Sequence, residues 1–367
     1  MSVIEGLETP AVLLDRVKLE CNLAAMQELA DAQGMALRPH AKTHKSVEIA
    51  RRQVALGASG LTVATVSEAR VFSTAGIGSI TISRPTMGGL ERLASIAQRV
   101  DLRIVVDSLR GIEVAAGSGL DLGVFIKVDV GLHRCGVDPQ GGEALELARQ
   151  IATVPNLNFR GILSHAGQVY AVAERQAAVE IAEAERTTML KVRDELIAAD
   201  LAVPEVSVGA TPTVLAAACF EGITEIRPGN YAFLDLLPIK VGVVTHEDVA
   251  LSVLATVISK NDQFFIVDTG SKTLTSDTGG HGMASAVGFG MAYPVDDYLN
   301  QHKALTVVGL SEEHGKLAHG DYDLPIGARV RIIPNHSCPV ANLAREYAVL
   351  DEDQVVAWPI DAPSHGK

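Results

Sequence analysis

The chain has 367 residues, of which 47% are hydrophobic and 20% charged, and its formal net charge is −13. This composition is typical of a globular protein with room for a large domain and a smaller one. The acidic balance argues against nucleic acid or an anionic membrane as a partner, so we expect a small-molecule substrate. No apolar run reaches the roughly 18 to 20 residues of a membrane span, and no signal peptide begins the chain, which predicts a cytoplasmic protein.

The first two thirds of the chain alternate short β-branched runs with longer stretches of helical periodicity, as βα units with a parallel sheet do. The runs lie at residues 36–38, 61–64, 79–82, 103–106, 124–128, 161–164, 205–208 and 225–227. The clearest helices are expected at residues 16–32, 47–56 and 174–199. Eight units in about 225 residues match the size of a TIM (β/α)8 barrel, and a doubly wound open sheet is the alternative.

After about residue 238 the long helical stretches end and β runs follow one another. We therefore predict an α/β barrel domain at residues 12–237 and an all-β domain at residues 238–367. The first 11 residues could pack with the second domain.

Unusual polar residues follow five of the eight predicted strands, where the loops of a parallel barrel carry its chemistry. Lys42 comes just after the first strand, between His40 and His44. Partial desolvation and the two neighbouring imidazoles would favour the neutral, nucleophilic amine that a Schiff base requires. An ordinary surface lysine is the alternative.

The loops after the seventh and eighth strands predict an anion site. Residues 209–211 run from a strand into a predicted helix, which offers free N–H groups, a hydroxyl and the positive end of a helix dipole. The loop at residues 229–231 could add further donors, and barrels often hold a phosphate at these two loops. The alternative is that the glycines only turn the chain. The candidate ligands are Gly209, Ala210, Thr211, Gly229, Asn230 and Tyr231.

Three other loop residues are candidates for contacts with a ligand. Arg134 could lie near a phenolate oxygen or a carboxylate, with a surface ion pair as the alternative. His165 and Tyr170 could contact the ligand ring or the substrate, with a structural histidine as the alternative.

His336 and Cys338 follow the run at residues 329–333. On an extended segment two side chains at positions i and i+2 point the same way, so an imidazole and a thiolate could bind one zinc ion. Two protein ligands would leave positions for water or substrate, as a catalytic metal requires. A chance spacing is the alternative.

Together these segments resemble the fold-type III pyridoxal 5'-phosphate (PLP) enzymes, whose barrel is alanine-racemase-like, and within them the D-serine dehydratase and D-threonine aldolase branch. The resemblance covers nearly the whole chain. Its most specific pieces are residues 38–45, 227–231, 311–315 and 336–338.

The resemblance implies that Lys42 carries PLP as a Schiff base and removes the Cα proton of the substrate. It places residues 209–211 and 229–230 around the phosphate, and Tyr170 near the cofactor ring. It makes His336 and Cys338 the ligands of a divalent metal, Zn²⁺ first, with Mn²⁺ or Mg²⁺ as alternatives. It also suggests that Glu313 and His314 approach the metal, and that the enzyme is a homodimer.

The activity implied is loss of water from a D-3-hydroxyamino acid such as D-serine, D-threonine or 3-hydroxy-D-aspartate, giving a 2-oxo acid and ammonia. Residues 165–167 and 207–213 resemble the dehydratases more than the aldolases, although Gln168 stands where a dehydratase usually has histidine. The alternatives are retro-aldol cleavage to glycine and an aldehyde, a metal-free racemase, and a PLP-binding protein without turnover.

Overall fold

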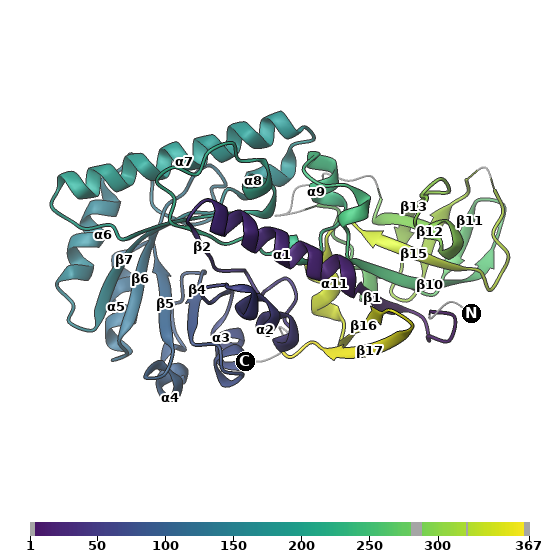
Figure 1. Ribbon diagram of the computed structural model, residues 1–367, viewed down its shortest axis with the longest axis horizontal. Helices are drawn as coiled ribbons and strands as arrows, with labels where there is room; N and C mark the ends of the chain where they lie inside the picture. The colour runs from purple at the N-terminus through teal and green to yellow at the C-terminus, as the bar shows by residue number, and fades with distance from the viewer. Residues whose placement is uncertain (1–3, 280–287, 321, 363–367) are drawn as a thin grey trace.

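The computed structural model describes residues 4–279, 288–320 and 322–362, and its sheets form two units that lie side by side (Figure 1). One unit has eight parallel strands and the other has nine mostly antiparallel strands. Among the described residues, no helix combines the length and the apolar character needed to cross a bilayer.

The parallel unit is a closed barrel, as the sequence predicts. Its strands pair in the order β2, β9, β8, β7, β6, β5, β4, β3. The end strands meet because His40 and Thr62 form a parallel bridge and the Ala41 N–H donates to the Thr62 carbonyl at 2.8 Å. The strands are β2 (Ala36–Leu37), β3 (Leu61–Val63), β4 (Ser79–Ile82), β5 (Asp101–Val106), β6 (Leu122–Lys127), β7 (Leu157–Leu163), β8 (Glu205–Val208) and β9 (Glu225–Ile226).

Helices cover the outside of the barrel (Figure 1). Helix α1 begins after Asp15, whose carboxylate accepts a hydrogen bond from the Lys18 N–H, and its buried residues recur at the helical spacing of the sequence. The predicted bounds of α1 and α2 are confirmed, and α7 is one residue shorter at each end than expected. The helices are α1 (Arg16–Ala32), α2 (Val47–Leu56), α3 (Val66–Thr74), α4 (Ala94–Ala97), α5 (Leu109–Gly117), α6 (Glu143–Ala152), α7 (Arg175–Ala198), α8 (Thr211–Ala216) and α9 (Leu236–Val241).

The second unit contains a ring of six strands with a three-stranded extension. Strand β10 pairs with both β15 and β11, which closes the ring β10, β11, β14, β13, β12, β15. The strands are β1 (Ala11–Asp15), β10 (Leu251–Lys260), β11 (Phe264–Val267), β12 (Gly290–Pro294), β13 (Leu305–Leu310), β14 (Gly315–Ala318), β15 (Arg329–Pro334), β16 (Glu346–Asp351) and β17 (Gln354–Pro359). Two short helices, α10 (Ser271–Leu274) and α11 (Ser337–Leu343), interrupt the strands.

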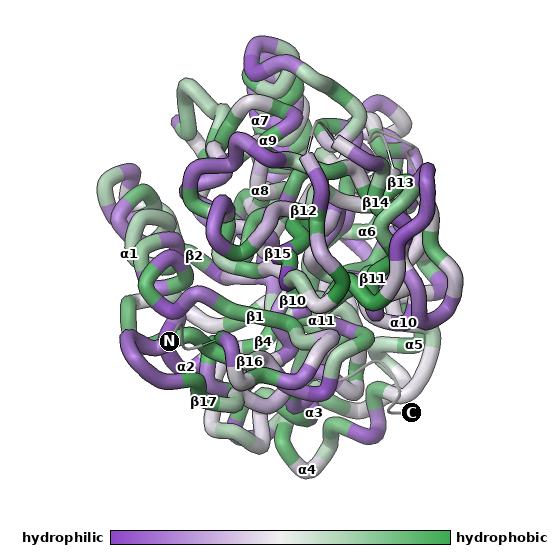
Figure 2. The backbone as a smooth tube through the Cα atoms, turned by 90° about the vertical axis from the view of Figure 1, so that its right-hand side faces the viewer, coloured by the Kyte–Doolittle hydropathy of each residue, from purple (hydrophilic) through white to green (hydrophobic). Residues whose placement is uncertain are grey.

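Strand β1 belongs to this second sheet, where it lies antiparallel to β10 and parallel to β16. The predicted barrel boundary at residue 12 therefore falls inside a strand of the β unit. A continuous hydrophobic core joins the units, since buried residues of the barrel and of β10 and β15 belong to one cluster. Figure 2 shows β1 as a hydrophobic stretch near the centre of the view, and its three middle residues are buried.

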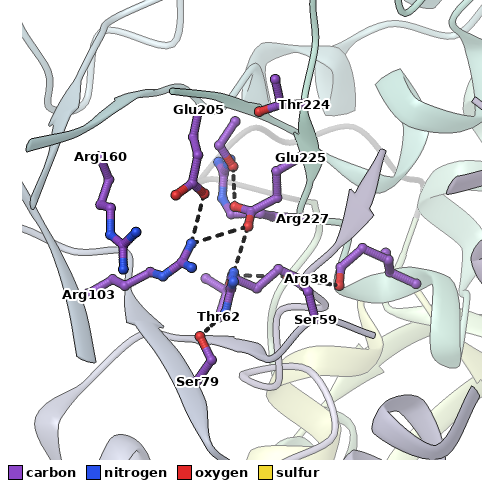
Figure 3. A network of polar contacts seen from close by, with 12 residues as sticks. Arg38, Ser59, Thr62, Ser79, Arg103, Arg160, Glu205, Thr224, Glu225 and Arg227 are labelled. Carbon is purple, nitrogen blue, oxygen red and sulfur yellow. Dashed lines mark hydrogen bonds and ion pairs between the residues drawn. The ribbon is translucent and has the colours of Figure 1, made fainter. Parts of the chain in front are cut away.

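A network of charged side chains fills the N-terminal end of the barrel (Figure 3). Arg38 Nε donates to Glu225 Oε2 at 2.6 Å, and both side chains are 2% exposed. Arg103 donates to Glu205 at 2.8 Å. Glu225 also accepts from Ser207, which in turn accepts from Arg227. Because Arg227 follows β9, this chain of contacts links the N-terminal end of the barrel to the opposite end, where parallel barrels carry their active sites.

Candidate active site

A pocket lies at the C-terminal ends of the barrel strands, where the β unit meets the barrel. Every residue predicted for the site lines it except Tyr231 and the suggested metal neighbours Glu313 and His314. The structure adds five residues that the sequence analysis did not assign to the site: His40, Thr43, Ser83, Lys127 and Arg227.

Lys42 lies in the loop between β2 and α2, and its amine faces this pocket. Burial lowers the pKa of Lys42, and Arg134 and Lys45 lower it further, although Cys338 and Glu68 act in the opposite direction. A lowered pKa raises the fraction of neutral amine, which is the form that a nucleophile or a base requires.

The two histidines beside Lys42 do not act as the sequence suggested. Burial lowers the pKa of His44 to about 3 and that of His40 well below its usual range, so both rings are neutral. His44 Nε2 lies 3.2 Å from Gln53 Oε1, in the core, while His40 Nε2 lies 3.1 Å from Ser83 Oγ. Desolvation and the cations near Lys42, rather than imidazolium neighbours, therefore favour its neutral form.

Contacts from both units hold the loop that carries Lys42. Lys45 Nζ lies 2.6 Å from the Glu68 carboxylate, and both side chains are 5% exposed. From the β unit, Tyr347 Oη donates to the His44 carbonyl at 2.6 Å and the Ala362 N–H donates to the Lys45 carbonyl at 3.0 Å. The β unit therefore positions the lysine loop directly.

The predicted phosphate ligands surround one end of the pocket. Gly209 has a φ of +143°, and a Cβ there would lie 3.0 Å from the Arg227 amide nitrogen, so this close approach requires glycine. Helix α8 begins at Thr211 and has only six residues, so its free N–H groups and the Thr211 hydroxyl are better candidates for anion binding than a helix dipole. The Tyr170 phenol hydrogen-bonds to Thr211, which places Tyr170 at this end.

Tyr231 is the predicted ligand whose side chain does not reach the pocket. Its phenol accepts a hydrogen bond from Gln53 Nε2 at 2.9 Å and the residue is 2% exposed. Its backbone N–H donates a hydrogen bond to Thr211 Oγ1. Gly229 and Asn230, the preceding residues in the chain, do line the pocket.

Two cations missed by the sequence analysis lie deep in the site. Burial, together with nearby Arg227, lowers the pKa of Lys127 to about 8. Burial lowers the pKa of Arg227 to about 10, although Glu225 and Glu185 oppose the change. With the exposed Arg134, the pocket combines a lysine amine, three further cations and a hydroxyl, a donor set that fits a phosphate-bearing cofactor with a carboxylate substrate. The sequence feature that could have indicated Lys127 is a basic residue at the end of an otherwise apolar, buried strand, here β6.

His165 presents a defined tautomer. Its Nδ1–H donates to the Gly209 carbonyl at 2.7 Å, so in the neutral form of the ring Nε2 is the hydrogen-bond acceptor. Gln168 is held by a hydrogen bond from Nε2 to the Val130 carbonyl, so it supports the loop after β6.

His336 and Cys338 converge in the pocket, but not on an extended segment as predicted. His336 is the N-cap of α11 and Cys338 lies in the first turn of that helix. The two side chains hydrogen-bond to each other, and Cys338 Sγ lies 3.3 Å from Thr43 Oγ1, next to Lys42. Burial raises the pKa of the Cys338 thiol, but His336 and Lys42 outweigh it and the net pKa is lowered. A thiolate beside an imidazole fits a divalent metal.

Residues of α11 are tied to the barrel by a buried hydrogen-bond network. The Ser337 N–H donates to Asp235 Oδ2 at 2.7 Å, and Ser337 Oγ donates to Asn230 Oδ1 at 2.7 Å. Asn230 Nδ2 donates to the same Asp235 carboxylate at 2.9 Å. The phosphate end and the His336–Cys338 pair therefore share one rigid support.

The suggested approach of Glu313 to the metal pair does not occur in this structure. Glu313 is 61% exposed and pairs with Lys272 at 2.7 Å on the surface, and neither it nor His314 lines the pocket. Within residues 4–279, 288–320 and 322–362, no group of three or more His, Cys, Asp or Glu side chains is arranged to hold a metal.

Comparison with known proteins identifies the family. Residues 14–236 match the model of the alanine racemase N-terminal domain, and residues 250–350 match a model of a serine dehydratase domain. The chain is 37% identical over 369 residues to the D-threo-3-hydroxyaspartate dehydratase of Delftia sp. (strain HT23), with 96% of this chain and 97% of the relative covered. The chain belongs to the D-serine dehydratase and D-threonine aldolase family of fold-type III PLP enzymes.

Other members of this family are similar over at least nine tenths of their length. The D-threonine aldolase of Arthrobacter sp. is 33% identical, with 97% of this chain and 92% of the relative covered. The solved structure of the Delftia dehydratase has a TM-score of 0.88 at 35% identity and 100% coverage of both chains. The D-threonine aldolase of Filomicrobium marinum has a TM-score of 0.85 at 31% identity, with 97% and 96% covered. The family and the fold predicted from the sequence are both confirmed.

Proposed function

We propose that this PLP-dependent lyase removes water from a D-3-hydroxyamino acid and releases a 2-oxo acid and ammonia. The observation that carries the proposal is one pocket lined by Lys42 and by the His336–Cys338 pair, in which Cys338 Sγ lies 3.3 Å from the hydroxyl of Thr43, the residue after Lys42. An amine that can remove a Cα proton and a metal pair that can act on a β-hydroxyl are the two parts that this elimination needs. The 37% identity to a hydroxyaspartate dehydratase supports the same choice.

In this proposal the barrel binds the cofactor and Lys42 has two tasks. PLP, when bound, withdraws electrons from the bonds at Cα. Lys42 holds the cofactor and then, as a free neutral amine, takes the Cα proton. Backbone groups of residues 209–211 and 229–230 hold the phosphate, with Tyr170 near the cofactor and His165 facing the ring or the substrate. Arg134, which lines the pocket, receives a phenolate or a carboxylate.

In the same proposal the β unit supplies the metal. Hydroxide is a poor leaving group, and a divalent cation would stabilise the charge that develops on it. His336 and Cys338 would hold this cation. Thiolate and imidazole favour Zn²⁺, with Mn²⁺ or Mg²⁺ as alternatives. A solved structure of a cysteine-to-alanine variant of a D-threo-3-hydroxyaspartate dehydratase in its metal-free form agrees with a metal role for a cysteine in this family.

We also propose a cytoplasmic homodimer. The four cysteines are free thiols, which fits a reducing compartment. Sedimentation of the holoenzyme tests the dimer, and a monomer at working concentration would contradict it.

Product analysis tests the reaction. The holoenzyme is incubated with D-serine, D-threonine and D-threo-3-hydroxyaspartate, and 2-oxo acid, ammonia, glycine and aldehyde are measured. We expect oxo acid and ammonia in equal amounts, with activity lost on EDTA treatment and restored by Zn²⁺. Glycine and aldehyde alone would contradict dehydration and support the aldolase reaction, which the 33% identity to a D-threonine aldolase favours as the second candidate. Racemised substrate without loss of amino acid would indicate a racemase, and no turnover a binding protein.

A further inference from the structure

Asp277 contacts His336 of the metal pair from within the β unit. It follows α10 in the β unit, and its Oδ2 lies 3.0 Å from His336 Nδ1. The side chains of His336 and Asp277 are 23% and 32% exposed, so the contact is shielded from bulk water on most sides. Asp277 itself does not line the pocket.

The contact selects one form of the imidazole. A carboxylate accepts hydrogen bonds, so the partner nitrogen, Nδ1, must carry the hydrogen. In the neutral ring Nε2 then carries the lone pair, so Nε2 is the atom that a metal would bind. A carboxylate on the remote nitrogen of a metal-binding histidine fixes the ring orientation and increases its basicity.

Asp277 is placed to act through His336 rather than as a further metal ligand. The two ring nitrogens point in different directions, so a carboxylate at Nδ1 lies on the side of the ring away from a cation on Nε2. Cys338 lies within hydrogen-bond reach of the same imidazole, and it completes the pair.

We propose that Asp277 is a positioning residue that fixes the tautomer and orientation of His336 and thereby sets the divalent-metal affinity of the His336–Cys338 pair. This inference rests on the metal pair of the proposed function, but not on which reaction the enzyme performs.

Metal binding, measured without turnover, tests the inference. Purified holoenzyme that retains PLP is stripped of metal, and Zn²⁺ is titrated in competition with a chromophoric chelator. We expect Asp277→Asn and Asp277→Ala to weaken Zn²⁺ binding about 10- to 100-fold, and Asp277→Glu to recover part of the loss. Asp262→Asn, an exposed acid in the same unit, is the matched control and should bind Zn²⁺ as the unmodified enzyme does. Circular dichroism and the visible PLP band report whether each variant is folded and loaded.

A double-mutant cycle separates positioning from general stability. In a His336→Ala background, Asp277→Asn should have no further effect on Zn²⁺ binding, because the imidazole through which Asp277 acts is absent. Zn²⁺ affinity within twofold of the unmodified enzyme in both the Asn and Ala variants would overturn the proposal. So would an additive effect in the double variant, or a loss in Asp277→Ala equal to that in His336→Ala, which would make Asp277 a ligand. If Zn²⁺ binding depends on neither His336 nor Cys338, the proposed metal site itself fails.

Discussion

Replacing Glu225 with glutamine would keep the size of the side chain but remove the negative charge between Arg38 and Arg227. Arg38 would remain 2% exposed without its carboxylate partner at 2.6 Å. Breaking a buried ion pair on one side costs about 3–5 kcal/mol, because an uncompensated charge stays buried. Arg103 lies 3.8 Å from Glu225, and in the variant it would still have its ion pair with Glu205 at 2.8 Å. We therefore expect the free energy of unfolding to fall by about 3 kcal/mol, at the low end of this range.

Urea denaturation followed by circular dichroism measures this loss. The matched control is Glu28→Gln, an exposed position on α1, which should change the free energy of unfolding by less than about 0.5 kcal/mol. Burial tends to raise the pKa of Glu225, but Arg38 and Ser207 outweigh it and the net pKa lies below the ordinary value of 4.5. The charge of Glu225 therefore stabilises the fold above that value, and its contribution is lost as the pH falls through the lower folded pKa. A loss of unfolding free energy below about 1 kcal/mol in Glu225→Gln would refute the reasoning. So would a loss that stays the same when the pH is lowered through the pKa of Glu225.

Three other substitutions test the site. Lys42→Ala should abolish the visible absorption band of lysine-bound PLP and lower kcat at least about 100-fold, because the base is lost. Replacing the exposed Lys191 with alanine is the control and should change neither, while a retained band in folded Lys42→Ala would disprove the assignment. Gly229→Ala would place a Cβ 2.8 Å from the Thr43 hydroxyl in the lysine loop and should weaken PLP binding, measured by fluorescence titration. Gly117→Ala is the control because its Cβ would meet no atom within 4 Å, and equal PLP affinities of the two variants would contradict the prediction. Tyr347→Phe removes a hydrogen bond to that loop and should lower the free energy of unfolding by about 1 kcal/mol in urea, with no change expected if the bond is unimportant.

Much of the barrel could be predicted from the sequence because its strands are short apolar runs separated by helices. Strands β4 and β8 match the predicted ranges, and β7 begins four residues early because Asn158 and Arg160 break the apolar run there. The place of β1 could not be predicted. Its neighbours, β10 and β16, lie far away in the sequence, and no local pattern specifies such pairing.

The site residues that were found are those with a local signature. Lys42 and the His336–Cys338 pair stand in distinctive segments, whereas Asp277 is 59 residues from His336 and resembles any loop acid in the sequence. Tyr231 was grouped with its loop neighbours Gly229 and Asn230, but it does not line the pocket and its side chain lies in the core. Side-chain direction in an irregular loop depends on packing that the sequence does not display.

The contacts from residues 347–362 to the lysine loop also bear on the order in which the enzyme is assembled. Tyr347 reaches back 303 positions to His44, so a ribosome that has finished the barrel has not yet made the residues that restrain Lys42. The barrel can form co-translationally with the Lys45–Glu68 pair in place, while the contacts from Tyr347 and Ala362 to the lysine loop form only after the β unit emerges. The full set of contacts that positions Lys42 is therefore completed only when nearly the whole chain has been made.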